Sequence, residues 1–196
     1  KELIDSQIPV VTFDRTINAL QCTSVVSDDL DSARNATNHL ITAGCKSIAL
    51  FTAQEGISVM KDRIIGYSKA MREHGLFDEA NIINFDNVEQ AEANITNILK
   101  ERSLDAVLTI DELLSVKTIK MAQQLKIAIP KDFKVIGFSN GQISKEFYPS
   151  VSSVNQHAEE MGALAASLLI DSIRNPDEIN IESKVVKSSL VERDSS

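Results

Sequence analysis

Short apolar runs alternate along the chain with longer stretches in which apolar residues recur every three or four positions. The short runs are rich in β-branched residues and predict strands at 10–13, 24–26, 47–51, 81–85, 106–110 and 134–138. The longer stretches predict helices at 31–43, 63–73, 88–100, 115–126 and 157–174. The segment 183–192 alternates apolar with polar residues and predicts one more strand.

This alternation of strands and helices predicts an α/β fold. Parallel strands need crossover connections, and the predicted helices supply them, so we expect an open, mostly parallel sheet flanked by helices. The runs 106–110 and 134–138 are apolar almost without interruption. Strands of that kind are covered on both faces.

The composition narrows the class of protein. The chain has 196 residues, 43% of them hydrophobic, which is enough to bury a core, and no run is long enough to span a bilayer. The net charge is −8 without a local cluster of Lys or Arg, so we do not expect these residues to bind nucleic acid directly. The start lacks a secretory signal, and the separated Cys22 and Cys45 are typical of reduced thiols, so we expect a cytoplasmic protein without a membrane partner.

Polar residues follow several predicted strands at their carboxyl ends, where open parallel sheets bind ligands. Asp14, Asp111, Ser139 and Asn140 hold such positions. Each also has a structural alternative. Asp14 could form a solvated pair with Arg15, and Asp111 could cap the next helix. Ser139 and Asn140 could simply form a turn.

Two further charged features have simple interpretations. Arg63 stands at the start of a predicted helix, where the helix dipole does not favour a positive charge, so we expect it to have a specific partner. The acidic residues of 78–92 are interpreted as the solvated face of a helix and the approach to it.

Catalytic and cofactor-binding motifs are missing from the sequence. It contains no G-x-G-x-x-G, no G-x-x-x-x-G-K-[ST], no G-x-S-x-G and no H-E-x-x-H. No spacing unites the three histidines as metal ligands or as members of a triad. We therefore expect no enzymatic activity, no metal and no cofactor.

Seven segments, in order, resemble the effector-binding core of LacI-family bacterial transcription regulators. They are IPVVTFDR, HLITAGCKSIALF, DRIIGYSKAMREHGL, LDAVLTIDELL, IPKDFKVIGFSN, YPSVSSVNQHAEEMGALAASLLID and KSSLVERDSS. The resemblance covers nearly the whole chain, and the order and spacing of the segments make it specific.

The resemblance implies a two-lobed α/β fold like that of periplasmic binding proteins, with parallel sheets flanked by helices. The lobe nearer the DNA would contain residues 1–27 and 157–178, and the far lobe 28–156 and 179–196. Crossings between the lobes are expected near 26–28, 154–156 and 179–182. The near lobe would be incomplete, because a helix-turn-helix head, its hinge and the first strands would lie outside this chain.

The implied function is sensory. In this family a small effector, usually a sugar or a nucleobase, binds between the lobes and changes the affinity of a homodimer for operator DNA. Here we expect a repressor with a sugar or sugar derivative as its effector, and contact with operator DNA only through the head. Two alternatives stay open from the residues: a periplasmic or secreted sugar-binding protein of the same fold, and an α/β enzyme using Asp14, Arg63 and Asp111.

The resemblance also implies roles for individual residues. Asp14 matches an effector contact from the near lobe, and Arg63 and Asp111 match contacts from the far lobe. Asp28 and Gln156 fall at expected crossings, where they would take part in the hinge.

Other expected effector contacts depart from the family pattern. Ile110 stands where many relatives have asparagine, and Ile57 where some have a polar residue. Ser139, which precedes the candidate contact Asn140, replaces the more usual aspartate. The loss of that carboxylate would favour an anionic effector facing Arg63.

Overall fold

The computed structural model describes residues 2–15, 20–53, 58–176 and 181–196. The chain forms two compact units and passes from one to the other three times. Unit 1 comprises residues 1–28 and 156–188, and unit 2 comprises residues 29–155 and 189–196.

Unit 2 is built on a six-stranded sheet with the strand order β4-β3-β5-β6-β7-β9. Its strands are β3 (Ile48–Ala53), β4 (Ile82–Phe85), β5 (Ala106–Thr109), β6 (Lys134–Phe138), β7 (Ser152–Asn155) and β9 (Ser189–Val191). Neighbouring strands are parallel except for β7 and β9. β5 is buried along its whole length, and β6 is buried apart from Lys134, as expected for strands covered on both faces.

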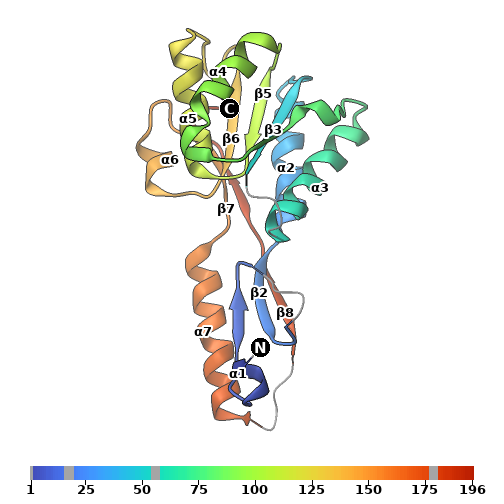
Figure 1. Cartoon of the computed structure of the whole chain (residues 1–196), viewed down its shortest axis with the longest axis vertical. Coiled ribbons are helices and arrows are strands. Elements are labelled where there is room, and N and C mark those ends of the chain that lie inside the picture. Colours follow the sequence, from blue (N-terminus) through green and yellow to red (C-terminus); the bar gives the residue numbers. More distant parts are fainter. Residues whose placement is uncertain (1, 16–19, 54–57, 177–180) are drawn as a thin grey trace. The chain divides into compact units, whose positions relative to one another are not determined.

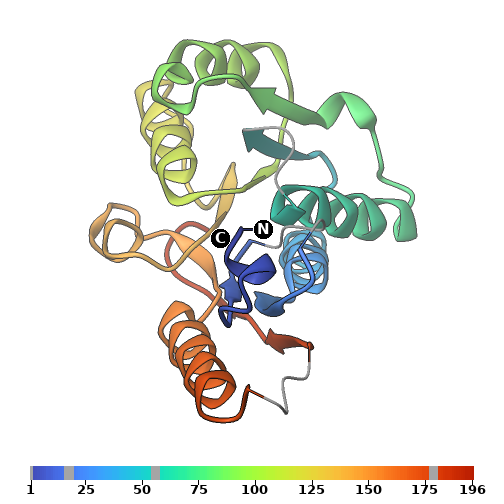
Figure 2. The same cartoon turned by 60° about the horizontal axis from the view of Figure 1, so that its bottom comes forward.

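Helices cover both faces of this sheet (Figure 1). α2 (Asp29–Thr42) and α3 (Ser58–Glu73) lie side by side on one face, as Figures 1 and 2 both show, and α4 (Glu92–Glu101) and α5 (Glu112–Gln124) pack together on the other. Short helical segments are α6 (Gln142–Glu146), η1 (Glu79–Asn81) and η2 (Val88–Gln90). The predicted α/β fold with mostly parallel sheets is confirmed.

The order in which the chain adds parallel strands to the sheet reverses between β3 and β5. From β3 it moves outward to the edge strand β4, and from β4 it returns past β3 to β5 and continues to β6. Open α/β sheets bind ligands at such a reversal, outside the carboxyl ends of the strands. We therefore expect a ligand site to be formed by the segments that follow these strands.

A glycine lets α2 and α3 approach closely. A Cβ at Gly66 would collide with the backbone carbonyl of Leu30 and would lie 3.0 Å from the Cβ of Ala33. The next residue of α3, Tyr67, is fully buried, and its hydroxyl donates to the carbonyl of Ile48 at 2.7 Å. Burial raises the pKa of Tyr67, so this hydroxyl stays a donor that ties α3 to the first residue of β3.

Unit 1 has a three-stranded parallel sheet with the order β1-β2-β8. Its elements are α1 (Glu2–Asp5), β1 (Val11–Phe13), β2 (Thr23–Ser27), α7 (Ala158–Arg174) and β8 (Ser183–Val186). α7 packs against β1 and β2. Among the described residues, its buried core is small and consists of Val25, Met161, Ala165 and Val186.

The structure differs from the sequence-based expectation at the end of the chain. The segment 183–192 is not one strand, because β8 pairs with β2 in unit 1 whereas β9 pairs with β7 in unit 2. Residues 183–188 consequently belong to unit 1, and the passage lies after Ser188 rather than near 179–182. The apolar pattern also predicted no strand at β7, because Ser152 and Ser153 are polar although both are fully buried.

Candidate functional site

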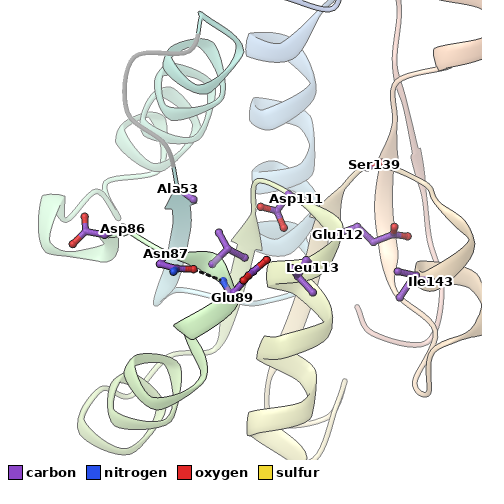
Figure 3. Close-up of a pocket in the computed structure, with 10 residues that line it drawn as sticks. Ala53, Asp86, Asn87, Glu89, Asp111, Glu112, Leu113, Ser139 and Ile143 are labelled. Carbon is purple, nitrogen blue, oxygen red and sulfur yellow. Dashed lines mark hydrogen bonds between the residues drawn. The ribbon is translucent and has the colours of Figure 1, made fainter.

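A cavity of about 670 Å³ opens at the carboxyl edge of the sheet of unit 2. It lies at the reversal of strand order, where Ala53 ends β3 and Asp111 follows β5. Its lining residues are Ala53, Asp86, Asn87, Val88, Glu89, Asp111, Glu112, Leu113, Ser139 and Ile143 (Figure 3). They come from the segments that follow four parallel strands, which is why residues distant in sequence meet here.

The wall of this cavity is acidic. Asp86, Glu89, Asp111 and Glu112 contribute carboxylates, and none of the ten lining residues is basic. Figure 3 shows the carboxylates of Glu89 and Asp111 on either side of the same space. Carboxylates around a concave surface create a negative potential, which repels anions and attracts hydrogen-bond donors.

Apolar side chains complete the wall. Leu113 is 44% exposed and Ile143 is 53% exposed, and both line the cavity together with Ala53 and Val88. A surface that combines a few fixed polar groups with apolar side chains is typical of sites for small organic ligands.

Two carboxylates are held in place by backbone amides. Oδ1 of Asp111 accepts a hydrogen bond from the backbone N of Leu114 at 2.7 Å, so Asp111 is the N-cap of α5. Oε1 of Glu112 accepts from the backbone N of Ser144, also at 2.7 Å. Because a carboxylate offers two oxygens and about four lone-pair sites, capping one oxygen does not prevent the group from binding a ligand.

Ser139 and its neighbour Asn140 are oriented differently. Ser139 is exposed, lines the cavity and has a φ of 76°, which non-glycine residues rarely adopt. Its backbone N donates to the carbonyl of Val154 at 3.0 Å. Asn140 is not among the lining residues, because its Oδ1 accepts from the guanidinium of Arg193 and lies 3.5 Å from Oγ of Ser153.

Arg63 and Ile110 are part of the packed interior and do not line the cavity. α3 begins at Ser58, so Arg63 lies in its second turn and not at its start. Arg63 is only 6% exposed. Its Nε donates to Oδ1 of Asp29 at 2.7 Å and its Nη1 to the carbonyl of Ile110 at 2.7 Å. The guanidinium lies 4.0 Å from the ring centre of Phe138, so the specific partners of Arg63 are internal ones.

The expectation of an anionic effector is therefore not supported. It required Arg63 to face the ligand, but Asp29 neutralises this arginine in the interior. Four carboxylates line the cavity together with Ser139. A serine in place of an aspartate at position 139 therefore does not leave the wall free of negative charge.

The remaining predicted contacts lie elsewhere. Asp14 belongs to unit 1, and its Oδ2 lies 3.8 Å from Nε of Arg15 in an exposed ion pair, which is the structural alternative to a ligand contact. Ile57 lies outside the described residues.

Asp28 and Gln156 lie beside passages between the units, and both make hydrogen bonds within unit 1. Oδ1 of Asp28 accepts from the backbone N of Ser188 at 2.8 Å, and Nε2 of Gln156 donates to Oγ of Ser27 at 3.2 Å. The bond of Asp28 joins the chain at the first passage, after residue 28, to the chain at the third passage, after residue 188. The bond of Gln156 joins the chain just after the second passage to Ser27, just before the first.

Sequence reasoning missed much of the acidic wall. Asp86 and Glu89 belong to the acidic stretch 78–92, for which the sequence predicts a solvated face, but they follow β4, whose carboxyl end lies at the same edge as those of β3 and β5. The end of the predicted strand 81–85 is the signal that points to these two residues. Glu112 directly follows Asp111 and shares its strand-end signal, whereas Ile143 carried no such signal, because it belongs to α6, whose placement depends on the tertiary fold.

Residues 37–196 match the family of periplasmic binding protein-like domains. This is most of the chain, so the chain belongs to that family. The predicted resemblance to the effector domains of LacI-family regulators is also confirmed, because its relatives are regulators of that kind.

The relatives and a solved structure give the extent of this similarity. The chain is 28% identical to the HTH-type transcriptional regulator RegA of Clostridium saccharobutylicum, over 88% of this chain and 53% of that protein. It is 29% identical to the ribose operon repressor of Halalkalibacterium halodurans, over 88% of this chain and 52% of the repressor. The solved complex of the transcriptional regulator CelR with cellobiose has a TM-score of 0.90 at 25% identity, covering 99% of this chain and 61% of that one.

The names of these relatives bear on the activity. They are named as regulators and repressors and not as enzymes, in agreement with the expectation of no enzymatic activity. The chain spans about half the length of the curated relatives it matches. Within the described ranges, no helix is long and apolar enough to cross a membrane, and no group of His, Cys, Asp and Glu side chains could hold a metal ion.

Proposed function

We propose that this chain is the effector-sensing core of a LacI-type transcriptional repressor and that it binds a neutral sugar in the cavity of unit 2. The observation that carries the proposal is the position of that cavity, at the carboxyl ends of the strands where their order reverses, in a chain whose relatives include a ribose operon repressor. The structural similarity to a regulator bound to cellobiose supports the same class of effector.

The chemistry of the wall suits a sugar. Sugar hydroxyls are donors for carboxylates, and a hydrogen bond to a charged group contributes about 1.5–3 kcal/mol, compared with about 0.5–1.5 for a neutral one. Asp111 and Glu112 are already oriented by backbone amides, so they lose little freedom on binding. The apolar side chains of Leu113 and Ile143 offer a surface for the C–H faces of the ring.

The same wall distinguishes neutral from anionic sugars. A sugar phosphate or sugar acid would bring a negative charge toward four carboxylates, with no basic residue among the ten that line the cavity. A neutral sugar avoids this repulsion and uses the carboxylates as acceptors. The charge of the wall therefore supports a neutral sugar as the effector class in this proposal.

Regulation would use the connections between the units. A ligand shifts a conformational equilibrium only by binding one state more tightly than the other. In our proposal, the sugar stabilises one arrangement of the units, and the passages beside Asp28 and Gln156 transmit this change. Operator DNA would be contacted by a head outside these residues, in a cytoplasmic homodimer.

Isothermal titration calorimetry tests the binding proposal. D-ribose and cellobiose should bind, whereas D-ribose 5-phosphate and D-gluconate should bind at least about tenfold more weakly. Asp111→Asn should weaken the neutral sugars by about tenfold, the effect of exchanging a charged acceptor for a neutral one. Because asparagine is as good an N-cap as aspartate, the stability of α5 should be preserved.

The control removes the same charge at a distance from the cavity. Glu101, the last residue of α4, is exposed and does not line it, so Glu101→Gln should leave sugar affinity unchanged. Tighter binding of the phosphate or the acid than of the neutral sugars would refute the charge argument. Absence of binding by every sugar at millimolar concentration would refute the sensing function.

A further inference from the structure

The C-terminal segment contacts the loop that carries Ser139. The guanidinium of Arg193 donates to the carbonyl of Val151 at 2.6 Å and to Oγ of Ser153 at 3.0 Å. It also donates to Oδ1 of Asn140, which lies 53 positions earlier in the sequence. One side chain therefore connects the end of the chain, β7 and the loop 139–141.

The base of this side chain is fixed. Ser195 is completely buried, its Oγ donates to the carbonyl of Val135 at 2.6 Å, and its own carbonyl accepts from the backbone N of Val135 at 2.8 Å. The backbone N of Arg193 donates to Oγ of Ser152 at 2.8 Å. The guanidinium thus extends toward the loop from a segment that is anchored to β6 and β7.

The loop needs such support. Ser139 lines the cavity with its backbone in the left-handed region, and a residue with this conformation persists only when its surroundings impose it. On one side Glu112 lies against the loop: its Oε1 accepts a hydrogen bond from the backbone N of Ser144 at 2.7 Å, and its carboxylate leaves no room for a Cβ at Gly141. On the other side, Asn140 is held by Arg193.

We propose that Arg193 is a positioning residue of the effector site. It acts through Asn140 and sets the conformation in which Ser139 lines the cavity, although Arg193 itself does not line it. The effect on sugar affinity rests on the function proposed above, whereas the effect on the loop does not. Lysine cannot replace this arginine, because a single ammonium lacks the planar fork that reaches three acceptors.

Hydrogen–deuterium exchange of the purified chain tests the positioning directly. In Arg193→Lys, exchange in the peptide covering 138–147 should become at least about tenfold faster, the consequence of losing a hydrogen bond from a charged group. The matched control is Asp194→Asn, in the adjacent residue, whose carboxylate accepts from Oγ of Ser150 at 2.6 Å. This control should leave exchange in 138–147 unchanged.

Sugar affinity provides the second readout. With D-ribose and cellobiose as probes, Arg193→Lys and Asn140→Ala should each weaken binding, and the double variant should be no worse than the stronger single one, because both remove the same link. Urea midpoints of all variants identify any loss that merely reflects unfolding.

The outcomes separate the two proposals. Unchanged exchange in 138–147 overturns the positioning role whether or not a sugar binds. Faster exchange with unaltered sugar affinity overturns its importance for the site, and additive effects in the double variant overturn the route through Asn140. If neither sugar binds the unsubstituted chain, the sensing function fails and the exchange result alone decides whether Arg193 positions the loop.

Discussion

The two units differ in how completely their sheets are covered. The sheet of unit 2 has helices on both faces and a continuous core that includes Phe51, Leu108 and Phe138, all fully buried. Unit 1 has four buried core residues among those described and leaves Phe13 and Val185 more than half exposed. Hydrophobic burial is the main favourable contribution to folding. Because unit 2 buries many more apolar side chains than unit 1, it receives far more of this stabilisation.

This difference explains where the candidate site is found. A binding site needs side chains held by packing and by a supporting set of hydrogen bonds. In unit 2, Asp111, Glu112 and the loop around Ser139 receive such support from backbone amides and from Arg193. In unit 1, the side chain of the predicted contact Asp14 forms an exposed ion pair with Arg15, a kind of interaction that stabilises little.

The largest expected effect comes from breaking the buried ion pair of unit 2. Asp29→Ala would leave the guanidinium of Arg63 buried without its carboxylate and should lower the free energy of unfolding of unit 2 by about 3–5 kcal/mol. Urea unfolding followed by circular dichroism would detect this loss. It would reduce or remove the stability advantage of unit 2 over unit 1.

A partly exposed ion pair in the same unit serves as the control. Arg34 and Glu73 join α2 to α3 at 2.9 Å, with about a third of each side chain exposed. Glu73→Ala should cost no more than about 1 kcal/mol. If Asp29→Ala costs as little as this control, the interior of unit 2 is not as closed to water as its burial indicates.

A smaller loss is expected from the helix pair of unit 2. In Gly66→Ala, the added Cβ would collide with the carbonyl of Leu30, and separating α2 from α3 should cost about 1–3 kcal/mol despite the higher helix propensity of alanine. Thermal unfolding monitored by circular dichroism measures the change. An unchanged or higher midpoint would show that the two helices can move apart without loss of packing.

The apolar periodicity predicted the elements that carry the core. All six apolar runs coincide with strands, and the reason is clearest for β5 and β6, because buried parallel strands need apolar side chains on both faces. The start of α3 was predicted at 63 but lies at Ser58, because apolar periodicity does not mark the first turn of a helix. β7 was missed by the pattern since Ser152 and Ser153 are buried through hydrogen bonds rather than apolar contacts.

The site was predictable as far as strand ends determine it. Asp111 and Ser139 line the cavity because the carboxyl ends of parallel strands meet at one edge. Arg63 and Asn140 were also expected there, but their side chains are engaged by Asp29, 34 positions away, and by Arg193, 53 positions away. Pairings over such distances follow from tertiary packing and not from local sequence.

The smallest expected effect is a gain in unit 1. Gly162 lies inside α7, and a Cβ at this position would meet nothing within 4 Å. Gly162→Ala should therefore stabilise unit 1 by about 0.5–1 kcal/mol, because alanine loses less backbone entropy in a helix. Slower hydrogen exchange in α7, with exchange in β5 of unit 2 unchanged, would confirm it. The same change from glycine to alanine is thus expected to lower the stability at Gly66 and to raise it at Gly162. Destabilisation by both variants would mean that α7 is packed more closely than the thin core of unit 1 indicates.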